Sequence, residues 1–288
     1  MKTPHAEAFF DPQTSTFSYV VHAPGNAQCA IIDSVLDYEP HAAKTSTESA
    51  QKLVDYIKAN QLELQWIIET HAHADHLSAG AWLQSQLGGQ IAIGSPITTV
   101  QNTFKTIYHL GDHVKTNGEP FDVLFKAGDQ FKIGDMTVDV LHVPGHTPAD
   151  MAYHVHDLGI FVGDTLFLPD VGSARCDFPG GDAEQLYDSV QKLLSFPDDT
   201  VLFMCHDYPP AGREPQHACT VAEQKQHNIH LRDGISKAGF VKMRTGRDAT
   251  LGMPRLILPS LQVNIQAGKL PQPEDDGHRY LKIPLNRF

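Results

Sequence analysis

The sequence predicts a single α/β domain, because short apolar runs typical of strands alternate with helical patterns along most of its length. The 288 residues include 41% hydrophobic and 19% charged side chains, a composition typical of a folded globular protein. No repeat of solenoid period and no long linker divides the chain. We therefore expect one domain over residues 1–288, with a helical and irregular C-terminal extension at about 214–288 packed on it.

The elements predicted in the first third of the chain surround a polar loop. The predicted elements are, in order, two strands (17–24 and 29–35), a helix with a polar face (46–60), a buried strand (64–70) and a second helix (77–89). Gly88 and Gly89 end the second helix, because glycine readily adopts the backbone conformation found at helix C-termini. The polar stretch 71–76 lies between the buried strand and this helix, and loops in such positions often carry functional residues.

The middle and last thirds continue the alternation of strands and helices. A hairpin is predicted over 131–147 with its turn at Gly134 and Asp135. The elements that follow are, in order, two buried strands (151–156 and 159–167), a helix (182–194), a third buried strand (200–207) and a long polar helix (214–237). The tail, including 258–277, is rich in Gly and Pro and shows no second core, and 108–117 is expected to be a solvated loop.

Charge and cysteine content exclude several classes of function. Asp plus Glu number 34 and Lys plus Arg 22, which gives a net charge of −12 and a pI near 5.7. Binding to nucleic acid or to an anionic membrane is therefore not expected. The four cysteines form no CxxC pair, and the first residues contain no apolar stretch typical of a signal peptide. We expect a cytoplasmic protein in which an anionic ligand needs a local basic patch.

Four potential metal ligands stand within six residues directly after the strand predicted at 64–70. They are His71, His73, Asp75 and His76. Three imidazoles and a carboxylate at one strand end would desolvate one another, whereas a divalent metal ion uses their lone pairs. A metal site is therefore a better interpretation of this segment than a purely structural cluster.

Three later strand ends carry further ligand types, His146, Asp164 and His206. Gly145 and Gly163 directly precede the first two, and glycine allows the tight turn and close backbone approach that a metal site needs. These three side chains are expected to join the four of the polar loop in one metal centre.

The remaining histidines, 17 in all with those above, show no comparable pattern. His142, His154 and His156 lie within strand-like runs, where a histidine is more often a surface residue or a satisfied core residue than a ligand. We expect these three to be ordinary strand residues.

The ligand residues, in this order, resemble those of the metallo-β-lactamase superfamily. The run His-x-His-x-Asp-His at 71–76, followed by His146, Asp164 and His206, is highly specific for that fold, and the match covers roughly 17–208. The resemblance implies a metallo-β-lactamase αββα four-layer sandwich with its metal site along one edge. Because this fold hosts many reactions, the reaction must be inferred from other segments.

Several other segments resemble the persulfide dioxygenases, or sulfur dioxygenases, of this superfamily. They are the run 172–178, the residues 205–208, the residues 240–242 and the tail 264–271. The helix at 228–233 is similar to that of a bacterial, glutathione-dependent branch. The interval of 70 residues from His76 to His146 is longer than in the mitochondrial type, and the excess at 98–120 is expected to form an extra lid.

The resemblance to persulfide dioxygenases implies one Fe(II) per chain, held by His71, His146 and Asp164. Two imidazoles and one carboxylate leave open positions for a substrate and O₂ on one face of the metal. The implied reaction, a step of sulfide oxidation, converts glutathione persulfide, O₂ and water to sulfite and glutathione. The remaining four groups would then surround the iron and tune it, namely His73, Asp75, His76 and His206.

A glyoxalase II-like thioesterase, which hydrolyses acylglutathione, is the alternative. All seven ligand positions of a dinuclear hydrolase are present, and the same four groups would then be working ligands of a site with two Zn(II) ions. The segments at 172–178 and in the tail favour the dioxygenase. A metal-binding sensor without catalysis is a third class, and it would require a filled coordination sphere.

Glutathione carries two carboxylates, so a protein of net charge −12 needs specific cations to bind it. Arg175 could form a bidentate pair with a carboxylate, and Tyr208 stands where glutathione-binding members of the superfamily place a tyrosine. Lys242 and Arg244 are further candidates. Cys176 is expected to be a packed neutral thiol rather than a nucleophile. A homodimer is a reasonable expectation for the assembly.

Overall fold

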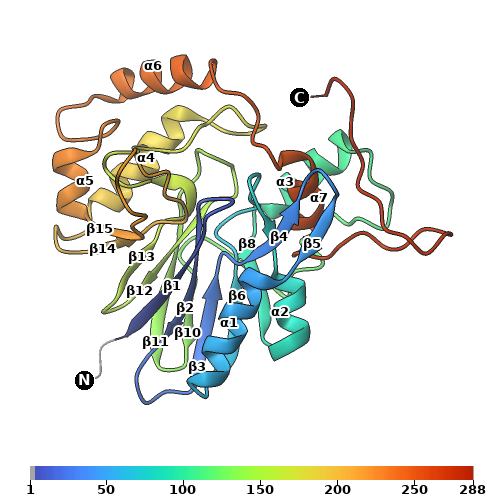
Figure 1. Ribbon diagram of the computed structural model, residues 1–288. Coiled ribbons are helices and arrows are strands. Elements are labelled where there is room, and N and C mark those ends of the chain that lie inside the picture. The colour runs from blue at the N-terminus through green and yellow to red at the C-terminus, as the bar shows by residue number, and fades with distance from the viewer. Residues whose placement is uncertain (1–3, 288) are drawn as a thin grey trace.

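Two six-stranded sheets packed face to face form the centre of the computed structural model, which describes residues 4–287 (Figure 1). The first sheet consists, in spatial order, of β1 (His5–Asp11), β2 (Thr16–His22), β3 (Gln28–Ile32), β6 (Glu63–Ile68), β8 (Gln90–Gly94) and β9 (Val123–Phe125). The second consists of β10 (Gln130–Ile133), β11 (Met136–His142), β12 (Met151–Val155), β13 (Gly159–Phe161), β14 (Val201–Phe203) and β15 (Ala218–Thr220). A small third sheet contains β5 (Lys44–Ser46), β4 (Val35–Glu39) and β7 (Leu77–Ser78).

Parallel pairing in both large sheets determines where the strands end. β3, β6, β8 and β9 run parallel to one another, and β13 runs parallel to β14. Parallel neighbours have their carboxyl ends at the same edge of a sheet. The segments that follow β3 and β6 are thus brought to one edge of the first sheet, and those that follow β13 and β14 to one edge of the second.

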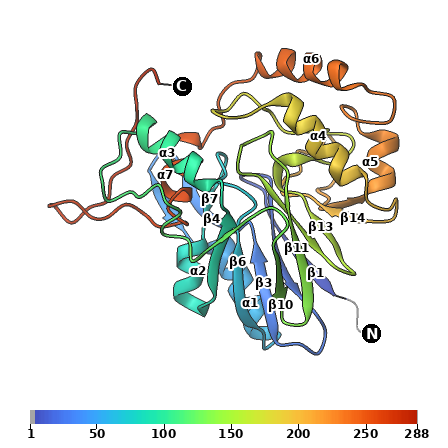
Figure 2. The same ribbon diagram turned by 180° about the vertical axis from the view of Figure 1, so that it is seen from behind.

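Within residues 4–287, seven α-helices lie outside the two sheets, and together they form the two outer layers (Figures 1 and 2). The hydrophobic cluster outside the first sheet includes residues of α1 (Glu48–Ala59), α2 (Gly80–Leu87), α3 (Ile97–Ile107) and α7 (Ile257–Asn264). The cluster outside the second sheet includes residues of α4 (Ala183–Leu194), α5 (Val221–His227) and α6 (Lys237–Asp248). The expected αββα four-layer arrangement is therefore confirmed. Between residues 4 and 287 no helix is long and apolar enough to cross a membrane.

The inner faces of the sheets share a third hydrophobic cluster, because apolar residues alternate along the strands. Tyr19 and Val21 of β2 point into this cluster from one sheet, and Val138 and Val140 of β11 from the other. Residues at every second position of a strand share a face, so the intervening residues of β11 point outward.

The prediction of one long helix at 214–237 is wrong. This stretch contains β15 and α5, and the next helix, α6, begins only at Lys237. The side-chain oxygen of Asn228 accepts hydrogen bonds from the backbone N–H groups of His230 and Leu231, at 2.8 and 3.0 Å, and thereby replaces helical bonds. Gly234 has a φ of +90°, which no helix allows, so the chain turns here before α6.

The prediction that 98–120 forms a lid is also wrong. Residues 97–107 form α3, and Val100, Phe104 and Tyr108 recur at the spacing of one helix face and are buried against the first sheet's helical layer. The hydroxyl of Tyr108 donates a hydrogen bond of 2.8 Å to the carbonyl of Ile257 at the start of α7. The buried face of α3 is part of the core, and none of the residues at 98–120 lines the large cavity described below.

Candidate metal centre

Segments from both large sheets meet at one edge of the molecule. β6 ends at Ile68, and the irregular segment after it carries the loop 71–76. From the second sheet, β13 leads into the short helical turn η1 (Gly163–Thr165), and β14 leads to His206. The backbone N–H of Met151 in β12 donates to the carbonyl of Thr70 at 2.9 Å and so links the two sheets beside the site. The parallel strand ends therefore bring the predicted ligand residues together.

Two glycines allow the close approach that the site requires. Gly163 has a φ of +55°, and a Cβ atom at this position would lie 2.8 Å from the hydroxyl of Thr70. Gly145 has a φ of +148°, and a Cβ atom there would lie 2.3 Å from the Cα atom of Leu186. Other residues would be strained or excluded at both positions. The roles expected for these glycines from the sequence agree with these contacts.

One group of possible ligands consists of His71, His146 and Asp164, each with one ligand atom within 4.8 Å of the others. Oδ2 of Asp164 lies 3.9 Å from Nε2 of His71 and 3.7 Å from Nε2 of His146. Nδ1 of His146 donates a hydrogen bond of 2.7 Å to the carbonyl of Arg175. This bond leaves the lone pair on Nε2, the nitrogen that faces Asp164.

A second group lies beside the first and contains His73, Asp75, His76 and His206. Nε2 of His206 lies 3.0 Å from Oδ2 of Asp75 and 3.4 Å from Oδ1 of Asp164. Asp164 therefore stands between the two groups, with one carboxylate oxygen directed to each.

Apart from the close contacts among the ligand groups themselves, several buried ligand atoms of both groups have no hydrogen-bond partner within residues 4–287. They are Nε2 of His71, Nδ1 of His73, Nε2 of His76, Nε2 of His206 and Oδ1 of Asp164. Buried polar atoms without partners are rare, because leaving them unsatisfied costs free energy. Imidazole nitrogens and carboxylate oxygens are the donors that Fe(II) and Zn(II) accept. The residues present thus fit a metal centre, and the number of ligand groups is compatible with one or two ions.

Two buried carboxylates beneath the loop orient His73. Nε2 of His73 lies 3.1 Å from Oδ1 of Asp33 and 3.4 Å from Oε2 of Glu69. Burial alone would lower the pKa of His73, but these carboxylates hold it well above its ordinary value. Asp33 also accepts hydrogen bonds from the N–H and the hydroxyl of Thr70 at 2.7 and 2.9 Å. Sequence reasoning missed both carboxylates, although each directly follows a strand, the signal that identified the later ligands.

A side chain from the C-terminal region holds the ligand loop. The amide nitrogen of Asn264 in α7 donates to the carbonyls of His73 and His76, at 2.8 and 2.7 Å. Its oxygen accepts the N–H of Ser78 at 2.7 Å. Asn264 is buried, so these three bonds fix the backbone of the loop without competition from water.

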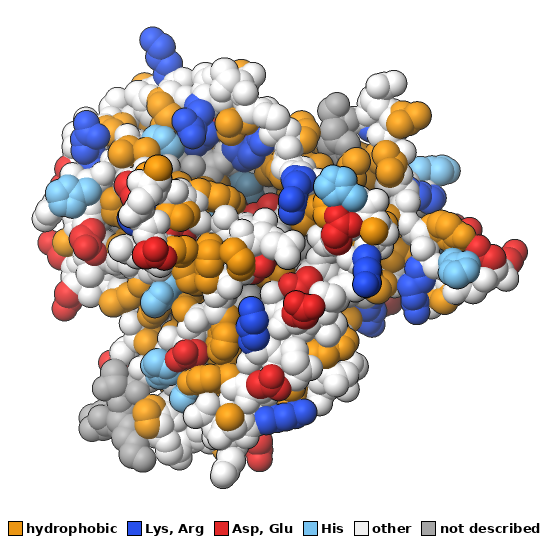
Figure 3. Space-filling model, in the orientation of Figure 1, with side chains coloured by type: hydrophobic (Ala, Val, Ile, Leu, Met, Phe, Trp, Pro, Cys, Tyr) orange, Lys and Arg blue, Asp and Glu red, His pale blue; other side chains and the backbone are white. Residues whose placement is uncertain are grey.

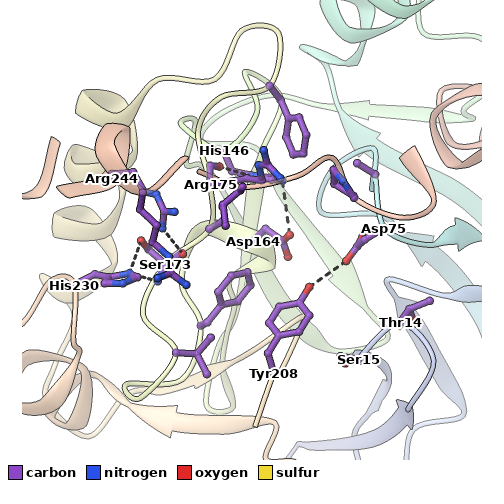
Figure 4. Close-up of a pocket in the computed structure, with 18 of the residues that line it drawn as sticks. Thr14, Ser15, Asp75, His146, Asp164, Ser173, Arg175, Tyr208, His230 and Arg244 are labelled. Atoms are coloured by element: carbon purple, nitrogen blue, oxygen red, sulfur yellow. Dashed lines mark hydrogen bonds and ion pairs between the residues drawn. The ribbon is translucent and has the colours of Figure 1, made fainter. Parts of the chain in front are cut away.

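A cavity of about 590 Å³ opens beside the metal centre (Figure 4). Asp75, His146 and Asp164 are among its lining residues, and the rings of Phe167 and Phe178 form apolar parts of its wall. Figure 3 shows one face of the molecule, and several Lys and Arg side chains lie around a hollow in its upper part. Cavities of this size are typical of small-molecule sites.

Three of the four predicted substrate-binding residues line this cavity, but two of these are already ion-paired. Arg175 donates to both carboxylate oxygens of Asp177, at 2.6 and 2.7 Å. Arg244 is buried and donates to Asp248 and, at 3.0 Å, to the carbonyl of Ser173. The hydroxyl of Tyr208 donates to Asp75 at 3.3 Å. Both arginines thus support the wall rather than offer a free charge.

Lys242 and Cys176 do not line the cavity. Lys242 is exposed on α6, two residues before the buried Arg244, and positions two apart point to nearly opposite sides of a helix. We therefore do not retain Lys242 as a substrate-binding candidate. Cys176 is buried, and burial raises the pKa of its thiol well above the usual range, as expected for a packed neutral thiol.

Two cations that sequence reasoning missed, Arg247 and Arg255, also line the cavity. Both side chains are exposed, and within residues 4–287 neither guanidinium group has an ion pair or a hydrogen bond. No sequence pattern identifies them, because an arginine in a polar helix or loop is usually a solvated surface residue. They are the cations of this wall that remain available to an anionic ligand.

Comparison with known proteins agrees with this arrangement. Residues 11–206 match the metallo-beta-lactamase superfamily. A probable metallo-hydrolase of Burkholderia pseudomallei is 51% identical over 97% of this chain and 98% of its own length. A protein of Dictyostelium discoideum named Glyoxylase B2 is 49% identical over 97% of this chain and 96% of its own length.

More distant similarity extends to persulfide dioxygenases. The mitochondrial persulfide dioxygenase ETHE1 of Homo sapiens is 27% identical over 90% of this chain and 87% of its own length. The crystal structure of ETHE1 from Myxococcus xanthus superposes with a TM-score of 0.74, at 27% identity, over 92% of this chain and 100% of that chain. The similar proteins thus include both hydrolase-type and dioxygenase names.

Proposed function

This chain belongs to the metallo-beta-lactamase superfamily, and we propose that it is an Fe(II)-dependent persulfide dioxygenase. The proposed reaction converts glutathione persulfide, O₂ and water to sulfite and glutathione. The observation that carries the proposal is the group His71, His146 and Asp164, two imidazoles and one carboxylate beside a large cavity. Such a group leaves positions open on one face of a non-haem iron. The similarity to ETHE1 supports the same reaction.

In this proposal the three residues hold the metal, and bound Fe(II) supplies the chemistry that O₂ requires. The protein contributes position and charge. The bond from His146 to the Arg175 carbonyl fixes its ring, and the carboxylate of Asp164 offsets part of the charge of the metal. The second group, with His206 3.4 Å from Asp164, orients that carboxylate from its other side.

The cavity wall fits the chemistry of glutathione persulfide. The rings of Phe178 and Phe167 lie 5.4 and 6.3 Å from those of His146 and His206 and make the wall beside the metal centre apolar. The unpaired guanidinium groups of Arg247 and Arg255 are available to the two carboxylates of the tripeptide. Arginine binds carboxylates through two parallel hydrogen bonds, which also fix the orientation of the ligand. These two side chains supply the local basic patch that an acidic protein needs for an anionic substrate.

Metal analysis and O₂ uptake test this proposal directly. We expect protein purified without oxygen to contain about one iron per chain and to consume O₂ when glutathione persulfide is added, with sulfite as the product. Two zinc ions per chain together with no O₂ uptake would contradict it.

A dinuclear thioesterase is the second candidate, and one observation favours it. The group His73, Asp75, His76 and His206 also has buried ligand atoms without partners, as a second metal ion would require. Two similar proteins carry the names metallo-hydrolase and Glyoxylase B2. This candidate predicts hydrolysis of S-D-lactoylglutathione by the metal-loaded protein.

Substitution of Asp75 separates the two candidates. Asp75→Asn removes a charge from the second group only, so a dioxygenase would keep its iron, whereas a thioesterase would lose its second metal and nearly all activity. Asp164→Asn is the matched control, because it faces both groups and is expected to reduce metal content in either case.

A further inference from the structure

A third cluster of ligand-type side chains lies outside the centre described above. Asp139 on β11 stands directly opposite His154 on β12 in the antiparallel register. His156 directly follows the end of β12, and its ring lies beside that of His154, with the ring centroids 5.0 Å apart. Oδ2 of Asp139 lies 2.7 Å from Nε2 of His156 and 3.5 Å from Nδ1 of His154, and the three ligand atoms are all within 4.8 Å of one another.

This cluster is separate from the metal centre. Val138 and Val155, which flank it in the register, point into the cluster between the sheets, so Asp139 and His154 point to the outer face of the second sheet. β12 starts beside the metal centre at Met151 and runs away from it toward His156. None of the three residues lines the large cavity.

Neighbouring groups already hold two of the three side chains in place. Nε2 of Gln130 donates to Oδ1 of Asp139 at 2.8 Å, which leaves Oδ2 directed at the histidines. The ring of His154 packs edge-to-face against Phe196 with centroids 5.0 Å apart. Ligands fixed in this way lose less conformational entropy when an ion binds.

The cluster is also open to an entering ion. The side chains of His154, Asp139 and His156 are 23%, 34% and 42% exposed, so the site is partly desolvated but reachable. His156 also lines a surface hollow of about 500 Å³ near the turn at Gly25 and Asn26. The exposed parts of the three side chains leave an ion bound there in contact with solvent, and water molecules would complete its coordination.

We propose that Asp139, His154 and His156 form a second, independent metal site that binds a divalent ion of the zinc or copper type. Two imidazoles select such ions over Ca²⁺ and Mg²⁺, which prefer oxygen ligands. The ion takes the place of the hydrogen bond between His156 and Asp139 and joins β11 to β12 on their outer face. The site shares no residue with the proposed iron centre, so either assignment can fail without the other.

Titration of the iron-loaded protein with Zn²⁺, followed by calorimetry, tests this site. We expect one additional ion per chain with a dissociation constant in the micromolar range, and at least a tenfold weaker affinity in His156→Gln. The matched control is His41→Gln, which removes an exposed histidine that pairs with Glu39 alone. The control is expected to bind the additional ion as the unchanged protein does, and O₂ uptake with glutathione persulfide is expected to be equal in all three.

Electron paramagnetic resonance with Cu²⁺ added to the iron-loaded protein in place of Zn²⁺ gives a second measurement. We expect hyperfine coupling to two nitrogens in the unchanged protein and to one in His156→Gln. Absence of an additional ion, or equal binding by His156→Gln and His41→Gln, would overturn the proposal.

Discussion

Among single residues, Arg247 and Arg255 offer a direct test of substrate binding, because both line the cavity as unpaired cations. If they bind the carboxylates of glutathione persulfide, Arg247→Glu removes a charge-assisted hydrogen bond worth about 1.5–3 kcal/mol. We expect the KM for glutathione persulfide to rise about tenfold or more, while kcat changes little. Steady-state O₂ uptake measures both constants.

Lys242→Glu is the control for this substitution. It makes the same change of charge on the same helix, but Lys242 is exposed and outside the cavity. We expect its KM to stay close to that of the unchanged protein. Equal effects of the two variants would mean that only the overall charge matters and that Arg247 does not contact the substrate.

Asp33 is expected to act on the metal through Thr70, whose hydroxyl lies 3.1 Å from Nδ1 of the proposed ligand His71. Replacement by Asn weakens the acceptor 3.1 Å from Nε2 of His73 and disturbs the two bonds from Thr70. Loss of such an orienting carboxylate typically costs a factor of about 10–100 in metal affinity. Competition with a chelator measures this. Asp37→Asn, which removes a carboxylate bonded to Ser49 instead, is expected to leave metal affinity unchanged.

Residues differ in how far the sequence could predict them. The seven ligand-type residues were predictable because a strand end and an adjacent glycine restrict what such residues can do. The cavity cations were not, because pairing is decided by tertiary neighbours. Asp177 neutralises Arg175, whereas Arg247 stands in the last turn of α6, where no apolar residue marks the inner face, and reaches the cavity unpaired.

At the level of elements, the turn between α5 and α6 depends on His230. Nδ1 of His230 accepts the N–H of Ser173 at 3.0 Å, which requires a neutral ring. Burial, and then the charges of Arg244 and Arg247, lower the pKa of this ring to about 4 from 6.5. The unfolded chain therefore takes up a proton at higher pH than the folded protein, and the free energy of unfolding falls as the pH falls from about 6.5 to 4.

His230→Asn tests this dependence, because an amide oxygen can accept the same bond without taking up a proton. We expect the loss of stability between pH 7 and 5, measured by urea unfolding, to be smaller in His230→Asn than in the unchanged protein. The ligand-type residues of the metal centre titrate in both proteins, so their contribution to the pH dependence of stability cancels when the two proteins are compared. Parallel curves for the two proteins would show that His230 does not contribute.

Elements with one clear apolar face were predictable, and elements interrupted by side-chain bonds were not. α1 and α4 follow the helical period of their buried residues, which is why both were predicted. The end of α5 depends on the bonds that Asn228 makes to the next residues, and no hydrophobic period reveals them. Short strands such as β9 and β15 have three residues each, too few to show an alternation.

For the whole molecule, we propose that the chain folds as one cooperative unit that includes the C-terminal extension. Val221 and Phe240 belong to the cluster outside the second sheet, and Ile257 and Leu261 to the cluster outside the first. A chain truncated after residue 213 would expose both clusters. We expect it to aggregate or to lose cooperative thermal unfolding, as measured by circular dichroism and calorimetry.

Truncation after residue 272 is the matched control. The residues that it removes are mostly exposed, so we expect a cooperative transition to remain. A soluble fragment 1–213 with its own cooperative transition would show instead that the extension is a separable unit.

The four layers of the molecule were predictable only through the ligand pattern and the resemblance that it supports. Alternating strands and helices indicate an α/β fold, but they do not reveal that two sheets face one another. Segment 98–120 shows the limit of such reasoning, because its extra length suggested a lid, whereas α3 and α7 pack together within the outer helical layer.

The position of Asn264 in the chain has a consequence for how the metal centre is completed during synthesis. The loop at 71–76 leaves the ribosome early, whereas the amide that holds its backbone is made almost 190 residues later. Until then the three hydrogen bonds of Asn264 cannot form, and the loop lacks part of what holds its backbone in the folded protein. The final geometry of the ligand loop is therefore reached only in the nearly finished chain.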